Sequence, residues 1–132
     1  MTAGETLAIV IDRDGITEPL SLAAAPAGWR ITSVPLHSKD LSFGDCVTLE
    51  ALPDALRVLS MQAGGWTTLR SRCPIPKSAA LVCEITSLGW LVRWAPSGHL
   101  ALAVPIELLE RAEALLDRCE ARSIIAAFER AK

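Results

Sequence analysis

Residues 90–104, with the sequence WLVRWAPSGHLALAV, predict a β-hairpin that organises the second half of the chain. Gly98 ends a three-residue loop at the position where such hairpins need a positive φ angle. If Ala95 opposes His99, the two tryptophans of the first strand share one face with the leucines of the second, while Arg93 and His99 lie on the other face. We therefore expect the tryptophan face to form a core and the Arg93 face to be open.

The elements around this hairpin follow a β-α-β-β-α-β order, which is the ferredoxin-like plan. A strand is expected at residues 66–73 and a helix at about 77–88, with Ser78 as its candidate N-cap. Apolar positions with a helical period after Pro105 predict a second helix. Residues 122–128 follow as a last strand, with a helical continuation as the alternative. In this plan the second hairpin strand lies beside the strand at 66–73.

The first half of the chain contains short β-rich runs separated by turn residues. Asp, Gly and Pro separate these runs, and this spacing suits a small twisted barrel or a half-barrel. The expected strands are residues 7–11, 29–34, 46–51 and 56–62. The predicted fold class is therefore α+β, with a small N-terminal β unit (a half-barrel) over residues 1–64 packed on a C-terminal ferredoxin-like unit over residues 65–132.

The composition excludes several classes of protein. With 51% hydrophobic residues and a net charge of -2, the 132-residue chain has enough apolar surface for a folded core and too little net charge for disorder. Every apolar run is shorter than the roughly 20 residues that cross a bilayer, so we expect no membrane association. The first eleven residues carry Glu5 rather than a basic region, which argues against a signal peptide and favours a cytoplasmic location.

The spacing of potential ligand residues indicates no metal site and no disulfide framework. The four cysteines form no CxxC pair, and the two histidines lack metal-type spacing. We expect no metal and no cofactor. Trp90 and Trp94 raise the alternative of an aromatic platform for RNA. That alternative is disfavoured, because 15 acidic residues against 13 basic ones argue against nucleic-acid binding and because the hairpin register turns both rings inward.

A basic cluster is the strongest candidate site. If Leu69 is buried, alternation along the strand at 66–73 brings four basic side chains to the open face: Arg70, Arg72, Arg93 and His99. Guanidinium groups bind phosphates and carboxylates in a bidentate manner, so an anion is one ligand for this cluster. The alternative, which we favour, is that the first half docks there and places an acidic residue such as Asp45 or Glu50 within about 4 Å of a guanidinium.

Four polar residues around a Gly-Asp turn form a weaker candidate: His37, Ser38, Asp45 and Cys46. They include a nucleophile and a base, but no motif orients them for nucleophilic catalysis. A structural role is favoured, in which Asp45 caps its turn and Cys46 enters the core. We therefore assign no catalytic residue.

The segment around that turn, VPLHSKDLSFGDCV at residues 34–47, resembles a bacterial family of small proteins that carries a domain-of-unknown-function label. The shared pattern is an apolar-Pro step, a Leu-Ser-x-Gly-Asp turn and a Val-Pro step before the last helix, and the similarity spans about residues 30–130. The chain departs from it at Leu36 and His37, where an aromatic is expected, and at Cys46. The resemblance implies a similar architecture and a bacterial origin, and it transfers no catalytic residue.

Two classes of function are compatible with these features. The favoured one is a non-catalytic module that binds a partner protein in the manner of an immunity or accessory subunit. Such a module needs no set of polar residues arranged for catalysis. The alternative is a small-molecule anion-binding protein or enzyme, whose site would lie in the cleft between the two halves.

Overall fold

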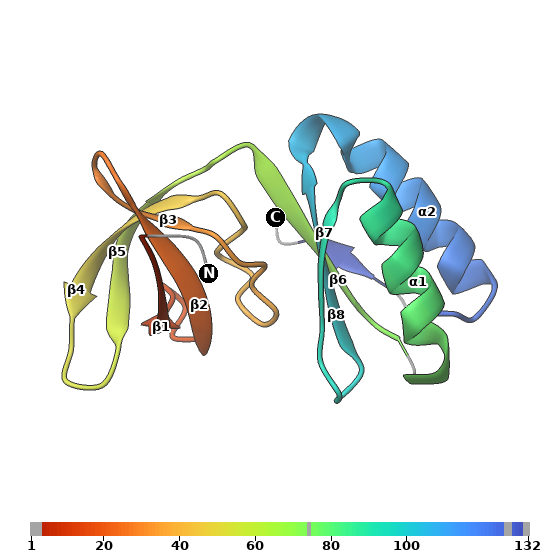
Figure 1. Cartoon of the computed structure of the whole chain (residues 1–132), viewed down its shortest axis with the longest axis horizontal. Helices are drawn as coiled ribbons and strands as arrows, with labels where there is room; N and C mark the ends of the chain where they lie inside the picture. Colours follow the sequence, from red (N-terminus) through yellow and green to blue (C-terminus); the bar gives the residue numbers. More distant parts are fainter. Residues whose placement is uncertain (1–3, 74, 126–127, 131–132) are drawn as a thin grey trace.

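The computed structural model describes residues 4–73, 75–125 and 128–130 of the chain. It has an α+β fold in which a five-stranded barrel stands beside a four-stranded sheet covered by two α-helices (Figure 1). Among the described residues, no helix is long and apolar enough to cross a membrane.

The first half of the chain forms a closed barrel, so the predicted half-barrel was wrong. Its strands are β1 (Glu5–Ile11), β2 (Thr17–Ala25), β3 (Gly28–Ile31), β4 (Cys46–Ala51) and β5 (Leu56–Gln62). Neighbouring strands are antiparallel except β1 and β5, which close the barrel through a short parallel pairing at Val10 and Ile11. The interior is filled by Val10, Leu20, Leu22, Ile31, Leu41, Val47 and Val58.

Strand β2 was not expected from the sequence, because Pro19 and a run of alanines are unfavourable in a paired strand. The pairing explains why Pro19 is tolerated. Within β2, strand β3 pairs only with Leu22–Ala25, so the β3 side of β2 lacks a partner strand at Pro19. A missing amide hydrogen costs little there. Strand β3 itself ends at Ile31, three residues before the predicted end.

The second half forms the sheet and its helices. Its elements are β6 (Trp66–Arg72), α1 (Ile75–Ser87), β7 (Leu91–Trp94), β8 (His99–Pro105), the 3-10 turn η1 (Ile106–Leu108), α2 (Leu109–Ala121) and β9 (Glu129–Arg130). The strand order is β7-β8-β6-β9, and every pair is antiparallel. The predictions that β8 lies beside β6 and that Trp94 faces Leu100 are both confirmed.

Two boundaries in this half differ from the sequence prediction. Helix α1 begins at Ile75, so Ser78 lies inside the helix and cannot be its N-cap. Its second residue is a proline, which the first turn of a helix tolerates because that amide hydrogen would have no partner. The strand predicted at 122–128 is wrong over residues 122–125, which form a turn and a bend. Residues 126–127 lie outside the described residues, and the strand follows only at β9.

The helices cover the tryptophan face of the sheet, as predicted. Trp90, Leu102 and Leu116 are buried in one cluster, and Trp94 and Leu109 pack against it. The indole rings are therefore part of this core and do not form an external platform for RNA. Burial of this face leaves the other face of the sheet turned towards the barrel (Figure 1).

A segment of the first half, residues 32–45, fills the space between the barrel and the sheet. It is the orange segment between the two bodies in Figure 1. Val34 and Leu36 of this segment form a third apolar cluster with Ala101 and Ala103 of β8. The small alanine side chains leave room for the segment, so the face expected to be open is covered by the chain itself.

Candidate functional site

The structure brings the four predicted basic residues to one face of the sheet. Arg70 and Arg93 are both opposite Ala101, and Arg72 is opposite His99, so the predicted register is confirmed. Their environments differ, however. Arg70 and Arg93 lie towards the 32–45 segment, and Arg72 and His99 lie at the end of the β7-β8 hairpin.

Arg70 holds the 32–45 segment against the sheet. Its side chain is buried, with 7% exposure, and its guanidinium donates hydrogen bonds to the backbone carbonyls of Pro35 (3.2 Å), Leu36 (3.2 Å) and Ser38. A buried guanidinium is stable when carbonyl oxygens accept its protons. Arg70 therefore binds the chain itself.

Arg93 contacts a carboxylate of the first half of the chain, as expected if that half packs on the sheet, but the carboxylate is not one of the two predicted. Its Nη1 lies 3.5 Å from Oε2 of Glu18 and donates to the carbonyl of Val34 at 3.3 Å. The expectation of Asp45 or Glu50 at this place was wrong. Glu50 forms an ion pair with Arg57 on the barrel. Glu18 was missed because it lies on β2, the strand that the sequence did not reveal.

Glu18 is the second anchor of the 32–45 segment. Its carboxylate is buried and accepts hydrogen bonds from three consecutive amides, those of Leu36 (2.9 Å), His37 (3.1 Å) and Ser38 (2.8 Å). Hydrogen bonds from backbone amides to a carboxylate are charge-assisted and among the stronger ones in proteins. Glu18 thus holds amides of the segment from the barrel side, and Arg70 holds its carbonyls from the sheet side.

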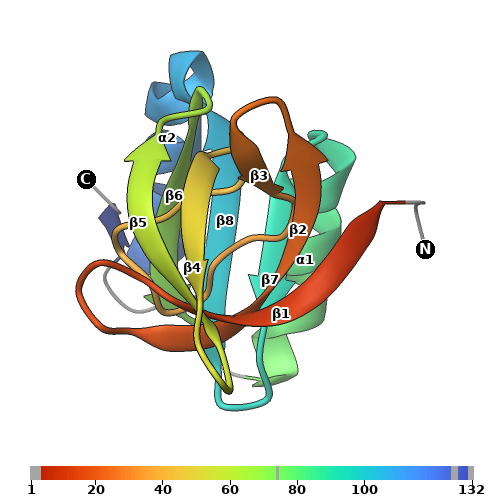
Figure 2. The same ribbon diagram turned by 90° about the vertical axis from the view of Figure 1, so that its left-hand side faces the viewer.

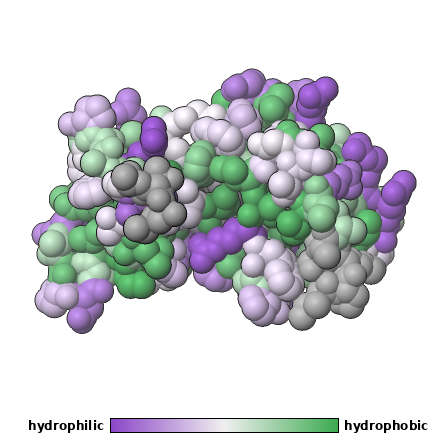
Figure 3. Space-filling model, viewed as in Figure 1, coloured by the Kyte–Doolittle hydropathy of each residue, from purple (hydrophilic) through white to green (hydrophobic). Residues whose placement is uncertain are grey.

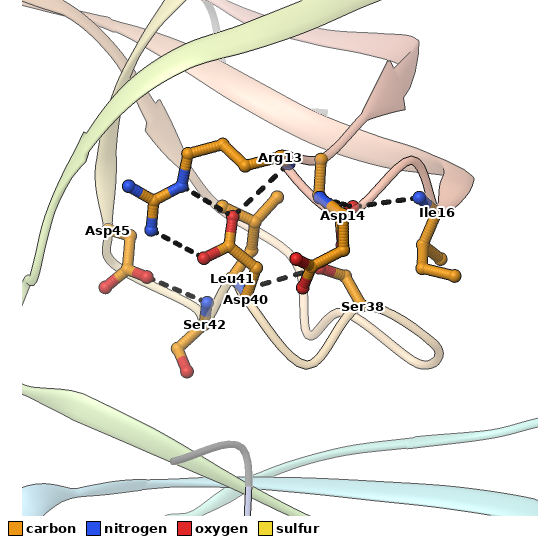
Figure 4. Close-up of polar contacts among 9 residues, drawn as sticks. Arg13, Asp14, Ile16, Ser38, Asp40, Leu41, Ser42 and Asp45 are labelled. Atoms are coloured by element: carbon orange, nitrogen blue, oxygen red, sulfur yellow. Dashed lines mark hydrogen bonds and ion pairs between the residues drawn. The ribbon is translucent and has the colours of Figure 1, made fainter.

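Further carboxylates complete the anchoring of the segment (Figure 4). The guanidinium of Arg13 binds both oxygens of Asp40, at 2.9 and 2.6 Å, and this hydrogen bond raises the pKa of Arg13 above its ordinary value. Asp45 accepts from the amides of Ser42 (2.9 Å) and Gly64 (3.0 Å), as a residue that caps its turn does. These acids have structural roles.

The cluster of His37, Ser38, Asp45 and Cys46 does not form a catalytic arrangement. The hydroxyl of Ser38 donates to Asp12, and its amide donates to Glu18. His37 is exposed, and its ring lies against that of His99 with 5.3 Å between centroids. Cys46 is half-buried on β4, so it does not enter the core as expected. Among the described residues, no three His, Cys, Asp or Glu side chains are grouped as metal ligands.

Arg72 and His99 remain accessible beside a pocket of about 370 Å³ at the end of the hairpin. Arg72 Nη2 lies 3.2 Å from His99 Nε2, and Ser97 Oγ lies 2.7 Å from His99 Nδ1. Because arginine only donates, Nε2 must accept, and Nδ1 then carries the hydrogen and donates to Ser97. In this arrangement Nδ1 of His99 is a donor and does not act as a base for Ser97. The hydroxyl hydrogen of Ser97 is then available to donate to another acceptor. Glu120 lines the same pocket.

The outer edge of β1 is a feature that the sequence analysis missed. Strand β1 pairs with β2 along its whole length but with β5 only at Val10 and Ile11. Among the described residues, none pairs with residues 5–9 on the other edge. Figure 2 shows this part of β1 crossing the barrel and extending beyond its other strands. Leu7 and Ile9 are 72% and 43% exposed there, and Figure 3 shows hydrophobic surface over β1 and β2.

Comparisons with known proteins give a similar fold and no activity. No family model matches the chain, and no curated protein matches it. Among solved structures, a hypothetical protein from Neisseria gonorrhoeae, described as a novel crystal structure, is similar with a TM-score of 0.63 and 19% sequence identity. The match covers 98% of this chain and 94% of that chain. At this identity the similarity concerns the fold alone, and the chain shares that fold over nearly its full length.

Proposed function

We propose that the chain is a non-catalytic module that binds a partner protein through the open edge of β1, as an accessory or immunity-like subunit. The observation that carries this proposal is an unprotected strand edge. Strand edges are usually protected by charges, by proline or by a covering element, since their unpaired backbone groups bind other strands. In the open part of β1, residues 6–9 carry no charge and no proline, and Glu5 at its beginning is the only charged residue of the strand. The apolar side chains of Leu7 and Ile9 are exposed there.

The partner that fits this edge is an extended segment with apolar side chains on one face. Such a segment would add a strand beside β1, where backbone hydrogen bonds supply affinity and contacts to Leu7 and Ile9 supply selectivity. The buried polar groups of the 32–45 segment support a non-catalytic role, because their hydrogen bonds hold the fold together.

A peptide titration tests this proposal. A labelled, capped peptide of alternating threonine and valine should bind, whereas the same peptide with alternate amides N-methylated should not, because it lacks the donors for the β1 edge. Ile9→Lys should abolish binding, and Ile106→Lys, at another exposed isoleucine, should leave it unchanged. Equal binding of both peptides, no binding, or self-association through β1 in place of peptide binding would refute the proposal.

A second candidate function, anion binding, is favoured by one observation: Arg72 and the hydroxyl hydrogen of Ser97 are both available at the 370 Å³ pocket. The ligand would be a small carboxylate or phosphate, and Glu120 would limit the charge it carries. Calorimetric titration with acetate and with inorganic phosphate should show binding that Arg72→Met removes and Glu120→Gln strengthens. Binding that neither variant changes would exclude this site.

Three broader assignments are also part of this proposal. The order β7-β8-β6-β9, with one helix in each crossover, supports a ferredoxin-like plan for the second unit. A cytoplasmic location is supported by the cysteines, none of which forms a disulfide among the described residues. A bacterial origin, and membership of the family with the domain-of-unknown-function label, rest on the sequence resemblance over about residues 30–130.

A further inference from the structure

A groove of about 600 Å³ runs along the outer wall of the barrel where the chain passes into the sheet. Its lining combines two aromatic rings, opposite charges, a hydroxyl and a thiol: Phe43, Trp66, Glu5, Arg30, Thr32 and Cys46. This size is in the range of pockets that bind small molecules, which usually combine apolar walls with a few polar groups. None of these residues belongs to the basic cluster on the sheet.

The barrel register places the two charges on either side of one alanine. Glu5 and Arg30 are both opposite Ala23, so they lie on the strands that flank β2. Residues opposite each other in a sheet point to the same face, and two strand intervals separate them by about 10 Å. Leu22 and Ile31, at the alternate positions, are buried inside the barrel. Glu5 and Arg30 therefore project outwards, over a small side chain.

The aromatic end of the groove is held in a fixed position. The rings of Phe43 and Trp66 are in edge-to-face contact, with 4.8 Å between centroids. Gly44 has a φ of 87°, and a Cβ atom there would lie 3.0 Å from the Trp66 ring. A Cβ atom on Gly64 would overlap the Gly44 carbonyl. The chain thus packs so closely around Trp66 that this ring forms a rigid wall.

We propose that this groove binds an aromatic α-amino acid, or a zwitterion of the same kind. The carboxylate would bind Arg30, the ammonium would bind Glu5, and the ring would pack against Trp66 and Phe43. Glu5 and Arg30 have long side chains that can bend towards each other over the small Ala23, so an α-amino acid, whose two charges are one carbon apart, can contact both. Thr32 also lines the groove, and its buried hydroxyl oxygen has no hydrogen-bond partner among the described residues.

Cys46 provides a direct readout of occupancy, because its thiol lines the groove. Alkylation by N-ethylmaleimide, quantified by mass spectrometry, can be compared with alkylation of the exposed Cys83 in the same molecule. The probes are L-tryptophan, tryptamine, which lacks the carboxylate, and indole-3-propionate, which lacks the ammonium. L-Tryptophan should slow alkylation of Cys46 saturably and leave Cys83 unchanged. The other two probes should need about tenfold higher concentrations, since each lacks one charge-assisted contact.

Two variants test which side chain binds the carboxylate of the ligand and which binds its ammonium group. Arg30→Met should reduce protection by L-tryptophan to the level of tryptamine, and Glu5→Gln should reduce it to the level of indole-3-propionate. Arg57→Met, which changes an arginine paired with Glu50 elsewhere on the barrel, is the matched control and should leave protection unchanged. Absence of protection, equal protection by the three probes, or equal slowing at Cys83 would overturn the proposal. These results do not depend on whether the β1 edge binds a peptide.

Discussion

Replacing Arg70 with methionine removes the contacts that hold the 32–45 segment on the sheet. Three backbone carbonyls, those of Pro35, Leu36 and Ser38, lose a charged donor in a buried place. At about 1 kcal/mol or more for each unsatisfied carbonyl, Arg70→Met should lower the free energy of unfolding by about 3 kcal/mol. Methionine keeps most of the apolar stem, so little packing is lost. For a chain of this size, the loss corresponds to a melting temperature lower by about 10 °C.

Urea unfolding followed by tryptophan fluorescence measures this loss. The matched control is Arg72→Met, two residues further along β6 on the same face but exposed, and it should change stability by less than about 0.5 kcal/mol. A ligand-binding role for Arg70 predicts the opposite, because removing a buried charge that has no structural role would leave stability unchanged or raise it. A cost below about 1 kcal/mol for Arg70→Met, or equal costs for the two variants, would refute the anchoring role.

Four other predictions can be tested by unfolding. Glu18→Gln should cost about 2 kcal/mol in urea unfolding, since an amide cannot accept all three backbone hydrogen bonds. Leu116→Ala should lower the free energy of unfolding by about 2 to 5 kcal/mol, whereas Leu88→Ala, at an exposed position, should leave it almost unchanged. The pKa of Cys119 is raised from its ordinary value of 9.0, mainly because the thiol is buried. The native state therefore binds this proton more tightly than the unfolded state, and the free energy of unfolding should fall as the pH rises above about 9. The fall should be less steep in Cys119→Ala. Calorimetry should show one cooperative transition, because the cluster around residues 32–45 joins both bodies.

The sheet and its core could be predicted because local signals agree with tertiary packing there. Gly98 fixes the hairpin loop, and alternation then fixes which side chains share a face. The same alternation correctly placed Arg70 and Arg93 on the face that the first half covers. Predictions of this kind succeed where the period of the sequence and the burial of the structure coincide.

The barrel could be predicted only in part, because its pairing depends on contacts between distant segments. Strand β2 contains a proline that looks unfavourable locally and is tolerated only because β3 does not reach it. Glu18 lies on that strand, so its role as the acid beside Arg93 could not be found from the sequence. The open edge of β1 depends on how little of it β5 covers, which no local pattern records.

The most direct test of the proposed function is amide hydrogen exchange with and without the threonine-valine peptide. Amides on an open strand edge exchange rapidly, and an added strand protects them. Protection should increase within residues 5–9 and stay unchanged in β7, which is one of the two outer strands of the sheet. Unchanged exchange at residues 5–9 with saturating peptide, or protection appearing in β7 instead, would contradict the claim that the chain binds its partner through β1.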